Sequence, residues 1–182
     1  MERHYLDIGC FHPKIIFNTY LLYKMGWKGT VIDLDEFKIK LFEKNRKNLI
    51  KSRIGAVVPG STGKKKFINV YKFNKPFSEL DTLSFNVAKK ICTKLKLKYK
   101  RVKVEKIGIN NLLKEKNYDF INIDVEGLDK KLILSLDFKK VHPPKLICFE
   151  SWNPLSDNSS YHFLKKNGYC HLFTSGGSVG II

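Results

Sequence analysis

The chain has 182 residues, about the length of one domain, and a formal net charge of +17. Hydrophobic residues make up 43% of it and charged residues 28%, a balance that excludes wholesale disorder. No apolar run approaches the ~18 residues of a membrane span, and the first strand begins without the apolar core of a signal peptide. We therefore expect a single domain over residues 1–182, no membrane span and a cytoplasmic location.

The N-terminal segment has the pattern of a nucleotide-binding βαβ unit. An apolar run at residues 5–8 stops at Gly9, and a second run at 30–32 stops at Asp33. Ligands bind at the carboxyl ends of such parallel strands. Gly9 would let the backbone approach a ligand closely, and Asp33 could accept hydrogen bonds from two ribose hydroxyls.

The loop after the first strand argues against a dinucleotide. Gly9 is followed by the residues CFHP, so the glycine-rich cradle G-x-G-x-x-G that binds a pyrophosphate is missing. A cofactor with an adenosine but no phosphates fits this loop better than NAD. The sequence therefore predicts S-adenosylmethionine.

The helix between these two strands is predicted to begin at Asn18. Asn18 has the character of an N-cap, and the helix would run to Met25 and end at Gly26 in the left-handed conformation. Thr19 then lies in the first turn, where free amides and the helix dipole could hold the methionine carboxylate of the cofactor. A simple helix cap explains Asn18 equally well.

The middle of the chain alternates between predicted helices and strands. Periodicity predicts a helix at 35–51, strands at 53–58 and 65–73, a helix at 84–97, a strand at 99–107 and a helix at 109–116. In the strand at 53–58, Ala56 and Val57 are expected to contact the cofactor. Residues 59–117 are expected to form an insertion that determines acceptor specificity and walls the pocket together with the loop at 152–158.

Acidic residues follow two predicted core strands near the C-terminus. The strand at 118–125 ends beside Asp124 and Glu126, before a helix at 129–136, and the strand at 146–149 leads into Glu150. Carboxylates at such positions are costly unless they bind a partner, so we expect these three to face a ligand, a cation or the substrate. A helix at 158–166 and a hairpin of 169–174 with 178–182 complete the predicted fold.

Five short motifs occur along the chain in a fixed order. They are His12-Pro13, Asn18-Thr19, Gly26-Trp27-Lys28-Gly29, Asp81-Thr82-Leu83-Ser84 and Asp124-Val125-Glu126-Gly127. Together they resemble the FkbM family of S-adenosylmethionine-dependent methyltransferases over most of the chain, although Asp81 departs from the usual residue at its position. The resemblance implies an α/β, Rossmann-like class I methyltransferase fold, with a mostly parallel central sheet, helices on both faces and an antiparallel C-terminal hairpin.

The same resemblance implies methyl transfer to a hydroxyl oxygen, on a sugar of a glycan or of a secondary metabolite. Asp124 and His12 are the candidate bases for the hydroxyl proton, with Glu126 and Glu150 nearby. For His12, a cap-like bond to the loop backbone is the alternative. A magnesium ion held by Asp124, Glu126 and Glu150 is an option that the sequence does not establish. The expected cofactor-binding residues are Asp7, Gly9, Cys10, Asn18, Thr19, Asp33, Ala56, Val57 and Asp124.

The basic composition leaves the acceptor open. Only four of the 34 basic residues are arginines, whereas nucleic-acid recognition relies on the arginine fork. The lysines either reflect an AT-rich genome or steer an anionic acceptor such as a phosphorylated glycan. The lysine-rich ladder at 94–103 alternates with apolar residues, which is typical of a strand with one solvated face.

Two further functions remain as alternatives. One is an RNA ribose 2′-O-methyltransferase, for which Lys14, Asp124 and Glu150 would supply part of the expected set. The other is a non-catalytic basic binding module.

The four cysteines lack C-x-x-C spacing, so they indicate neither a zinc site nor a disulfide framework. Cys10 is interpreted mainly as a small residue that fits the cofactor loop.

Overall fold

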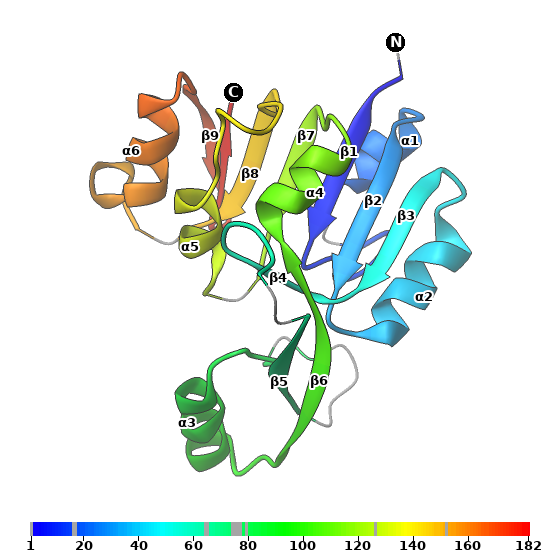
Figure 1. Ribbon diagram of the computed structural model, residues 1–182, viewed down its shortest axis with the longest axis vertical. Coiled ribbons are helices and arrows are strands. Elements are labelled where there is room, and N and C mark those ends of the chain that lie inside the picture. Colours follow the sequence, from blue (N-terminus) through cyan, green and yellow to red (C-terminus); the bar gives the residue numbers. More distant parts are fainter. Residues whose placement is uncertain are drawn as a thin grey trace.

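Parallel strands form the centre of the main sheet. The computed structural model describes residues 2–15, 18–63, 66–73, 78, 80–125, 127–151 and 153–182. Within these ranges the main sheet has seven strands in the order β3-β2-β1-β7-β8-β10-β9 (Figure 1). Their bounds are His4–Ile8 (β1), Lys28–Asp33 (β2), Leu49–Ile54 (β3), Phe120–Ile123 (β7), Leu146–Glu150 (β8), His171–Ser175 (β9) and Ser178–Ile181 (β10).

The strand directions confirm the predicted α/β fold class. β3, β2, β1, β7 and β8 pair in parallel, whereas β10 runs antiparallel to both β8 and β9. The sheet is therefore mostly parallel and ends in an antiparallel C-terminal hairpin. Because parallel strands have their carboxyl ends at one edge, Gly9, Asp33 and Asp124 reach the same edge.

Helices cover both faces of this sheet. They are α1 (Tyr20–Lys24), α2 (Glu36–Asn45), α4 (Ile109–Glu115), α5 (Asp129–Leu134) and α6 (Ser159–Lys166), with a 3₁₀ turn at Leu155–Asp157. Neighbouring residues of β1 point to opposite faces. Leu6 and Ile8 share a buried cluster with α4, α5 and α6, whereas Tyr5 packs in a second cluster with Phe42 of α2.

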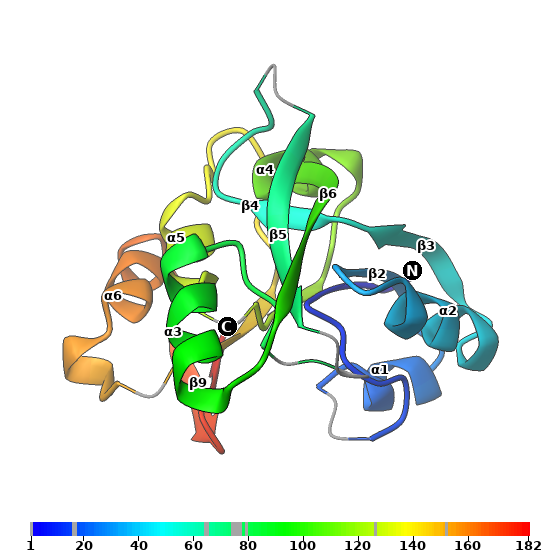
Figure 2. The same cartoon turned by 90° about the horizontal axis from the view of Figure 1, so that it is seen from below.

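A second, smaller sheet projects from the main body as an arm. Its strands are β4 (Ala56–Val58), β6 (Tyr99–Gly108) and β5 (Phe67–Phe73), and β6 pairs with β4 in parallel and with β5 in antiparallel fashion. The arm also carries α3 (Phe85–Leu95), which lies on the side of α5 and α6, opposite α1 and α2 (Figures 1 and 2). Most of the expected insertion at 59–117 forms this arm, but α4 packs in the main core through Leu112 and Leu113.

The predicted helix at 35–51 is wrong in its second half. α2 ends at Asn45, and Leu49–Ile54 forms β3 at the edge of the sheet. Arg46 leaves the helix with φ −120° and ψ 104° because its guanidinium is buried against the loop after β1. Phe37, in the first turn of α2, is 56% exposed.

The predicted strand at 53–58 is divided between the two sheets. β3 ends at Ile54, and after Gly55 the chain leaves the main sheet and pairs with β6 as β4. A Cβ at Gly55 would lie 2.6 Å from Cδ1 of Ile107, so a larger residue here would have to displace the Ile107 side chain. This crossing places Ala56 and Val57 beside the carboxyl end of β2.

Other segments differ less from expectation. The lysine ladder is not a single strand, because Lys94 belongs to α3 and Lys96 ends that helix at φ 54° before β6 begins at Tyr99. Along β6 itself, Lys103 is exposed while Val102 and Val104 are half-buried, as expected for a solvated face.

Within the described part of the chain, no helix is both long and apolar enough to cross a membrane. The single-domain assignment stays a prediction.

Candidate active site

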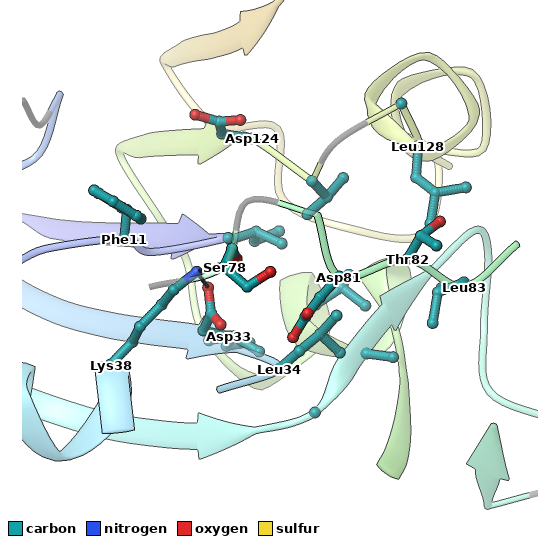
Figure 3. Close-up of a pocket in the computed structure, with 18 of the residues that line it drawn as sticks. Phe11, Asp33, Leu34, Lys38, Ser78, Asp81, Thr82, Leu83, Asp124 and Leu128 are labelled. Carbon is teal, nitrogen blue, oxygen red and sulfur yellow. Dashed lines mark hydrogen bonds and ion pairs between the residues drawn. The ribbon is translucent and has the colours of Figure 1, made fainter. Parts of the chain in front are cut away.

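A cavity of about 560 Å³ lies at the carboxyl ends of β1, β2 and β7 and continues to the arm (Figure 3). Its volume is typical of small-molecule sites, which are roughly 300–1,000 Å³. The main body contributes Ile8, Gly9, Phe11, Asn18, Ile32, Asp33, Leu34, Lys38, Asn122, Asp124, Val125, Gly127, Leu128 and Lys131. The segment from Gly55 to the start of α3 contributes Gly55, Ala56, Val57, Ser78, Asp81, Thr82, Leu83, Ser84 and Val87.

Asp33 is a buried carboxylate at one end of this cavity. It is 7% exposed, and its Oδ1 accepts a hydrogen bond from the backbone N–H of Asp35 at 2.7 Å. Burial raises the pKa of Asp33 to about 6, while Lys38 and the Asp35 N–H act in the opposite direction. The Nζ of Lys38 lies 3.6 Å from Oδ2 of Asp33, and Figure 3 shows the two side chains meeting at the pocket.

Gly9 and Asp124 meet where β1 and β7 end. The backbone N–H of Asp124 donates to the carbonyl of Ile8 at 2.9 Å, which continues the pairing of the two strands. Gly9 has φ +81°, and a Cβ there would lie 1.6 Å from the carbonyl oxygen of Asp124. Only glycine therefore fits this turn. Asp124 is exposed and lines the cavity.

The prediction that Asn18 caps the first helix is wrong. α1 begins at Tyr20 with Thr19 as its N-cap residue, and Asn18 turns toward the sheet. The Nδ2 group of Asn18 donates to Oδ1 of Asn122 at 2.9 Å, and Nδ2 of Asn122 donates to Oδ1 of Asp7 at 3.0 Å. Asn18 and Asn122 both line the cavity, so this amide pair joins the first loop to the central strand β7.

Asp7 and Thr19 are fully buried behind the cavity lining. The Thr19 hydroxyl donates to Oδ2 of Asp7 at 2.5 Å and accepts from Nη1 of Arg46 at 2.9 Å. Burial raises the pKa of Asp7, and the bonds from Thr19 and Asn122 and the nearby Arg46 oppose that shift. Both residues were expected to bind the cofactor. Neither lines the cavity, and their hydrogen bonds connect Asn122 to Arg46, so their cofactor-binding role stays a prediction.

Arg46 is a buried cation that holds the first loop in place. It is 1% exposed and donates to the carbonyl oxygen of Pro13 from Nε at 3.0 Å and from Nη2 at 2.9 Å. Its Nη1 also donates to the Tyr5 hydroxyl at 3.0 Å, and the guanidinium carbon lies 4.6 Å from the ring centre of Phe42. Since a guanidinium keeps its charge in a protein, these partners offset the cost of burying it.

The other walls of the cavity come from the arm. Ala56 and Val57, expected at the cofactor site, are buried and line the cavity together with Gly55. The motif at residues 81–84 also lines the cavity. Oδ1 of Asp81 accepts from the N–H of Phe73 at 2.9 Å, and Ser84 caps α3 by accepting from the N–H of Val87. Figure 3 shows Thr82 and Leu83 on the side of Leu128.

His12 and Cys10 lie outside the cavity lining. Nδ1 of His12 accepts backbone N–H bonds from Lys14 and Ile15, both at 3.1 Å, which is the cap-like alternative to a role as base. Cys10 is fully buried in the cluster on the α2 face, and burial raises the pKa of its thiol. The position of Cys10 fits the interpretation of a small core residue.

Of the three expected magnesium ligands, Asp124 and Glu150 belong to the described residues. Glu150 ends β8 beside Asp124, because Ile123 pairs with Phe149, but Glu150 is half-buried and lies outside the cavity lining. Glu126 lies outside the described residues. Among the residues that are described, no group of three or more His, Cys, Asp or Glu side chains could hold a metal ion. The three-carboxylate magnesium site stays a prediction.

Four contributors to the site were missed in the sequence. Lys38 lines the cavity, Asn122 links Asn18 to Asp7, Arg46 anchors the loop, and Asp129 accepts the N–H groups of Val125 and Gly127. Asn122 carried a signal, since it is the one amide within the apolar run FINI of β7. Lys38 and Arg46 carried none, because a basic residue among 34 gives no indication of burial.

The family model described as the methyltransferase FkbM domain matches residues 7–169. The chain belongs to the FkbM methyltransferase family. The match includes the end of β1 and the loop after it, the arm and the strand that leads to Asp124, so the predicted family and the predicted enzyme class are confirmed. A comparison with curated proteins gives no match.

Solved structures of methyltransferases are also similar to this FkbM chain. One is assigned as a methyltransferase of Thermoplasma acidophilum, with 12% identity, a TM-score of 0.46, and coverage of 100% of this chain and 68% of that one. Another is precorrin-6y C5,15-methyltransferase of Geobacter metallireducens GS-15, with 11% identity, a TM-score of 0.43, and coverage of 99% and 77%.

The cavity has the donor and acceptor groups that the cofactor of a methyltransferase requires. An ionised carboxylate has about four acceptor positions. In Asp33 the N–H of Asp35 uses one and Lys38 faces the other oxygen, which leaves capacity for two ribose hydroxyls. The buried wall of Ala56 and Val57 beside Asp33 offers an apolar surface for a flat base. Methyltransferases of this kind generally use S-adenosylmethionine, and these residues fit it.

Proposed function

We propose that this FkbM protein transfers the methyl group of S-adenosylmethionine to a hydroxyl oxygen, on a sugar of a glycan or of a secondary metabolite. The observation that carries the proposal is that Asp33 and Asp124 line one cavity from the ends of β2 and β7, the strands on either side of β1. Asp33 has the place and the free acceptor capacity for a ribose. Asp124 lies on the β7 side, where the reacting hydroxyl would have to approach.

In this proposal the cofactor is held by residues of both sheets. Asp33 would accept the ribose hydroxyls, Ala56 and Val57 would contact the adenine, and Asn18 with the turn at Gly9 would face the methionine part. When bound, S-adenosylmethionine supplies an electrophilic methyl group on its sulfonium sulfur. The amide bond between Asn18 and Asn122 would keep this end of the cavity in a fixed shape.

Asp124 is the proposed base. An alcohol is a poor nucleophile while it keeps its proton, so a group in the cavity must take that proton as the new bond forms. Asp124 lines the cavity, is exposed, and has its backbone N–H bonded to the carbonyl of Ile8. His12 is the weaker candidate, since Nδ1 already accepts two backbone bonds.

The acceptor would enter between α5 and the arm. Leu83 and Val87 line this side from the arm, and Leu128 and Lys131 line it from α5. The apolar side chains suit the carbon face of a sugar or an attached hydrophobic group. Lys131 suits an anionic substituent on the same molecule, in agreement with the net charge of +17.

The test is methyl transfer from labelled S-adenosylmethionine to separate pools of glycans, small glycosides and RNA. Labelling of a sugar-containing pool, with loss of that labelling in Asp33→Ala and Asp124→Asn, would support the proposal. RNA is included because of the high positive charge, and labelling of RNA alone would replace the sugar acceptor with a ribose 2′-hydroxyl. Absence of cofactor binding by calorimetry would favour a binding module without catalysis.

A further inference from the structure

Lys38 is a buried ammonium group at the cofactor end of the cavity, and the function proposed above gives it no role. Its side chain is 9% exposed, although it belongs to the outer helix α2. Nζ lies 3.6 Å from Oδ2 of Asp33, 3.4 Å from the carbonyl oxygen of Ser78, and 5.2 Å from the ring centre of Phe11. A lysine is rarely so buried unless it is paired, so these contacts account for its position.

The three contacts of Lys38 come from different parts of the chain. Asp33 ends β2, Phe11 belongs to the loop after β1, and Ser78 belongs to the connection from β5 to α3. Ser78 is 5% exposed, and its hydroxyl accepts the N–H of Leu80 at 3.2 Å. Asp81, which follows, accepts the N–H of Phe73 and lines the cavity. Lys38 thus links the Asp33 carboxylate, on the cofactor side, to the acceptor-side wall at 81–84.

We propose that Lys38 is a positioning residue that keeps the Asp33 carboxylate ready for the ribose and fastens the 81–84 wall to the cofactor site through Ser78. The proposal rests on the function proposed above for the cofactor itself. It adds a coupling between the two halves of the cavity, because the same ammonium group supports both the Asp33 carboxylate and the wall that faces the acceptor. The lysine need not touch the reacting atoms.

The charges around Asp33 favour this role for Lys38. Lys38 is the largest influence that lowers the pKa of Asp33, ahead of the Asp35 N–H, and Lys72 of β5 acts in the same direction. The Asp35 carboxylate acts in the opposite direction. Cys10 is also close enough to be influenced by Asp33, but its thiol stays neutral because burial raises its pKa. Removal of Lys38 leaves only the weaker opposing groups, so the Asp33 carboxyl would bind its proton more tightly.

The experiment compares Lys38→Met with Lys38→Arg and Lys40→Met. Methionine removes the charge at similar length, and arginine restores a cation. Lys40 lies on the same helix but pairs with Glu36 at the surface, 67% exposed, so Lys40→Met is the matched control. The first readout is an NMR titration of the Asp33 carboxyl carbon in cofactor-free protein. We expect the midpoint to rise by about one pH unit or more in Lys38→Met and to stay unchanged in Lys40→Met.

Two further readouts separate positioning from a general loss of structure. Hydrogen exchange of the amides at 80–84 should become faster in Lys38→Met while the amides of β1 and β7 stay protected. Binding of S-adenosylhomocysteine, followed by calorimetry, should reach half of its full affinity at a higher pH than in the wild type. Lys38→Arg should restore most of the wild-type behaviour in both measurements. If Lys38→Met does not fold, Lys38→Gln takes its place.

The outcomes distinguish this proposal from the proposed function. Unchanged Asp33 titration and unchanged exchange at 80–84 in the uncharged variant would overturn the role of Lys38. A wild-type protein that does not bind S-adenosylhomocysteine would overturn the cofactor proposal, and the titration and exchange measurements on free protein would still decide the role of Lys38. Equal effects from Lys40→Met would also overturn it, because any lysine on α2 would then suffice.

Discussion

Asn18 and Asn122, 104 positions apart, are joined by a 2.9 Å hydrogen bond between their side-chain amides. The bond fixes the loop after β1 on the central strand β7, and Asn122 continues the chain of bonds to buried Asp7. Thr19 and Arg46 bind the opposite side of this network. The floor of the cavity is therefore held by a network of buried and partly buried polar contacts, whose loss should affect stability and cofactor affinity together.

Arg46→Met should strongly destabilise the protein. The substitution leaves the buried Asp7 carboxylate without its nearby cation, and breaking a buried charge network costs about 3–5 kcal/mol of unfolding free energy. Chemical denaturation measures the loss. Lys47→Met, at the neighbouring exposed position, should stay within about 0.5 kcal/mol of wild type. Equal stabilities for the two variants would show that the Arg46 network contributes nothing to the fold.

Gly9→Ala and Gly26→Ala test the turn at the cofactor site. Both glycines have φ +81°, so alanine costs about 1–2 kcal/mol at either position. At Gly26 the added Cβ meets open space, whereas at Gly9 it collides with the carbonyl of Asp124. We expect Gly9→Ala to lose about 1–3 kcal/mol more than Gly26→Ala in denaturation. Similar losses would mean that the strand ends can separate without cost.

Asp33 should make cofactor binding depend on pH. Its raised pKa of about 6 means that the carboxyl is neutral below and ionised above that value. Because hydroxyl donors favour the ionised form, affinity should be complete above pH 6 and should fall as the pH drops through 6. Asp33→Asn should weaken binding by about 1–3 kcal/mol and abolish this dependence. Calorimetry at several pH values measures this dependence. If Asp33→Asn still lost affinity as the pH fell through 6, the assignment of Asp33 to the ribose would be wrong.

Asp124→Asn should lower kcat by about 10²-fold or more if Asp124 is the base. Asparagine keeps the shape but cannot take the proton, and the exposure of this side chain predicts little change in melting temperature. Asp137→Asn, at a surface pair with Lys140, is the control. Magnesium added to metal-stripped enzyme tests the ligand alternative, since recovered activity would make Asp124 a metal ligand. Near-full turnover of Asp124→Asn would shift attention to His12.

Lys131→Gln should reduce kcat/KM for an anionic acceptor while cofactor affinity stays unchanged. Lys131 lines the cavity, whereas Lys139 is exposed on the surface and serves as the control in Lys139→Gln. Steering by charge also predicts that kcat/KM of the wild type falls steeply with salt while kcat changes little. A profile that does not respond to salt would support the view that the lysines reflect genome composition.

Much of the fold was predictable because it depends on local patterns. The strands at β1, β2, β7 and β8 are apolar runs that end at Gly9, Asp33, Asp124 and Glu150, and the positions of those ends determine where a ligand can bind. The hairpin of β9 and β10 was likewise signalled by Gly176 and Gly177 between two short strands. These features need only the side chains of a few neighbouring residues.

The sequence by itself therefore determined the family, the order of most elements and the places of Asp33 and Asp124 at the carboxyl ends of β2 and β7. Only the tertiary structure decided that Arg46 ends α2, that β4 leaves the main sheet after Gly55, and that Asn18 binds Asn122 instead of capping a helix. The physical reason is that each of these depends on distant partners: Pro13 and Tyr5 for Arg46, Ile107 for Gly55, and a strand 104 positions away for Asn18. Local propensity is too weak to reveal such contacts, because burial of a charge or an amide is stable only when the partners that satisfy it are brought together by the whole fold.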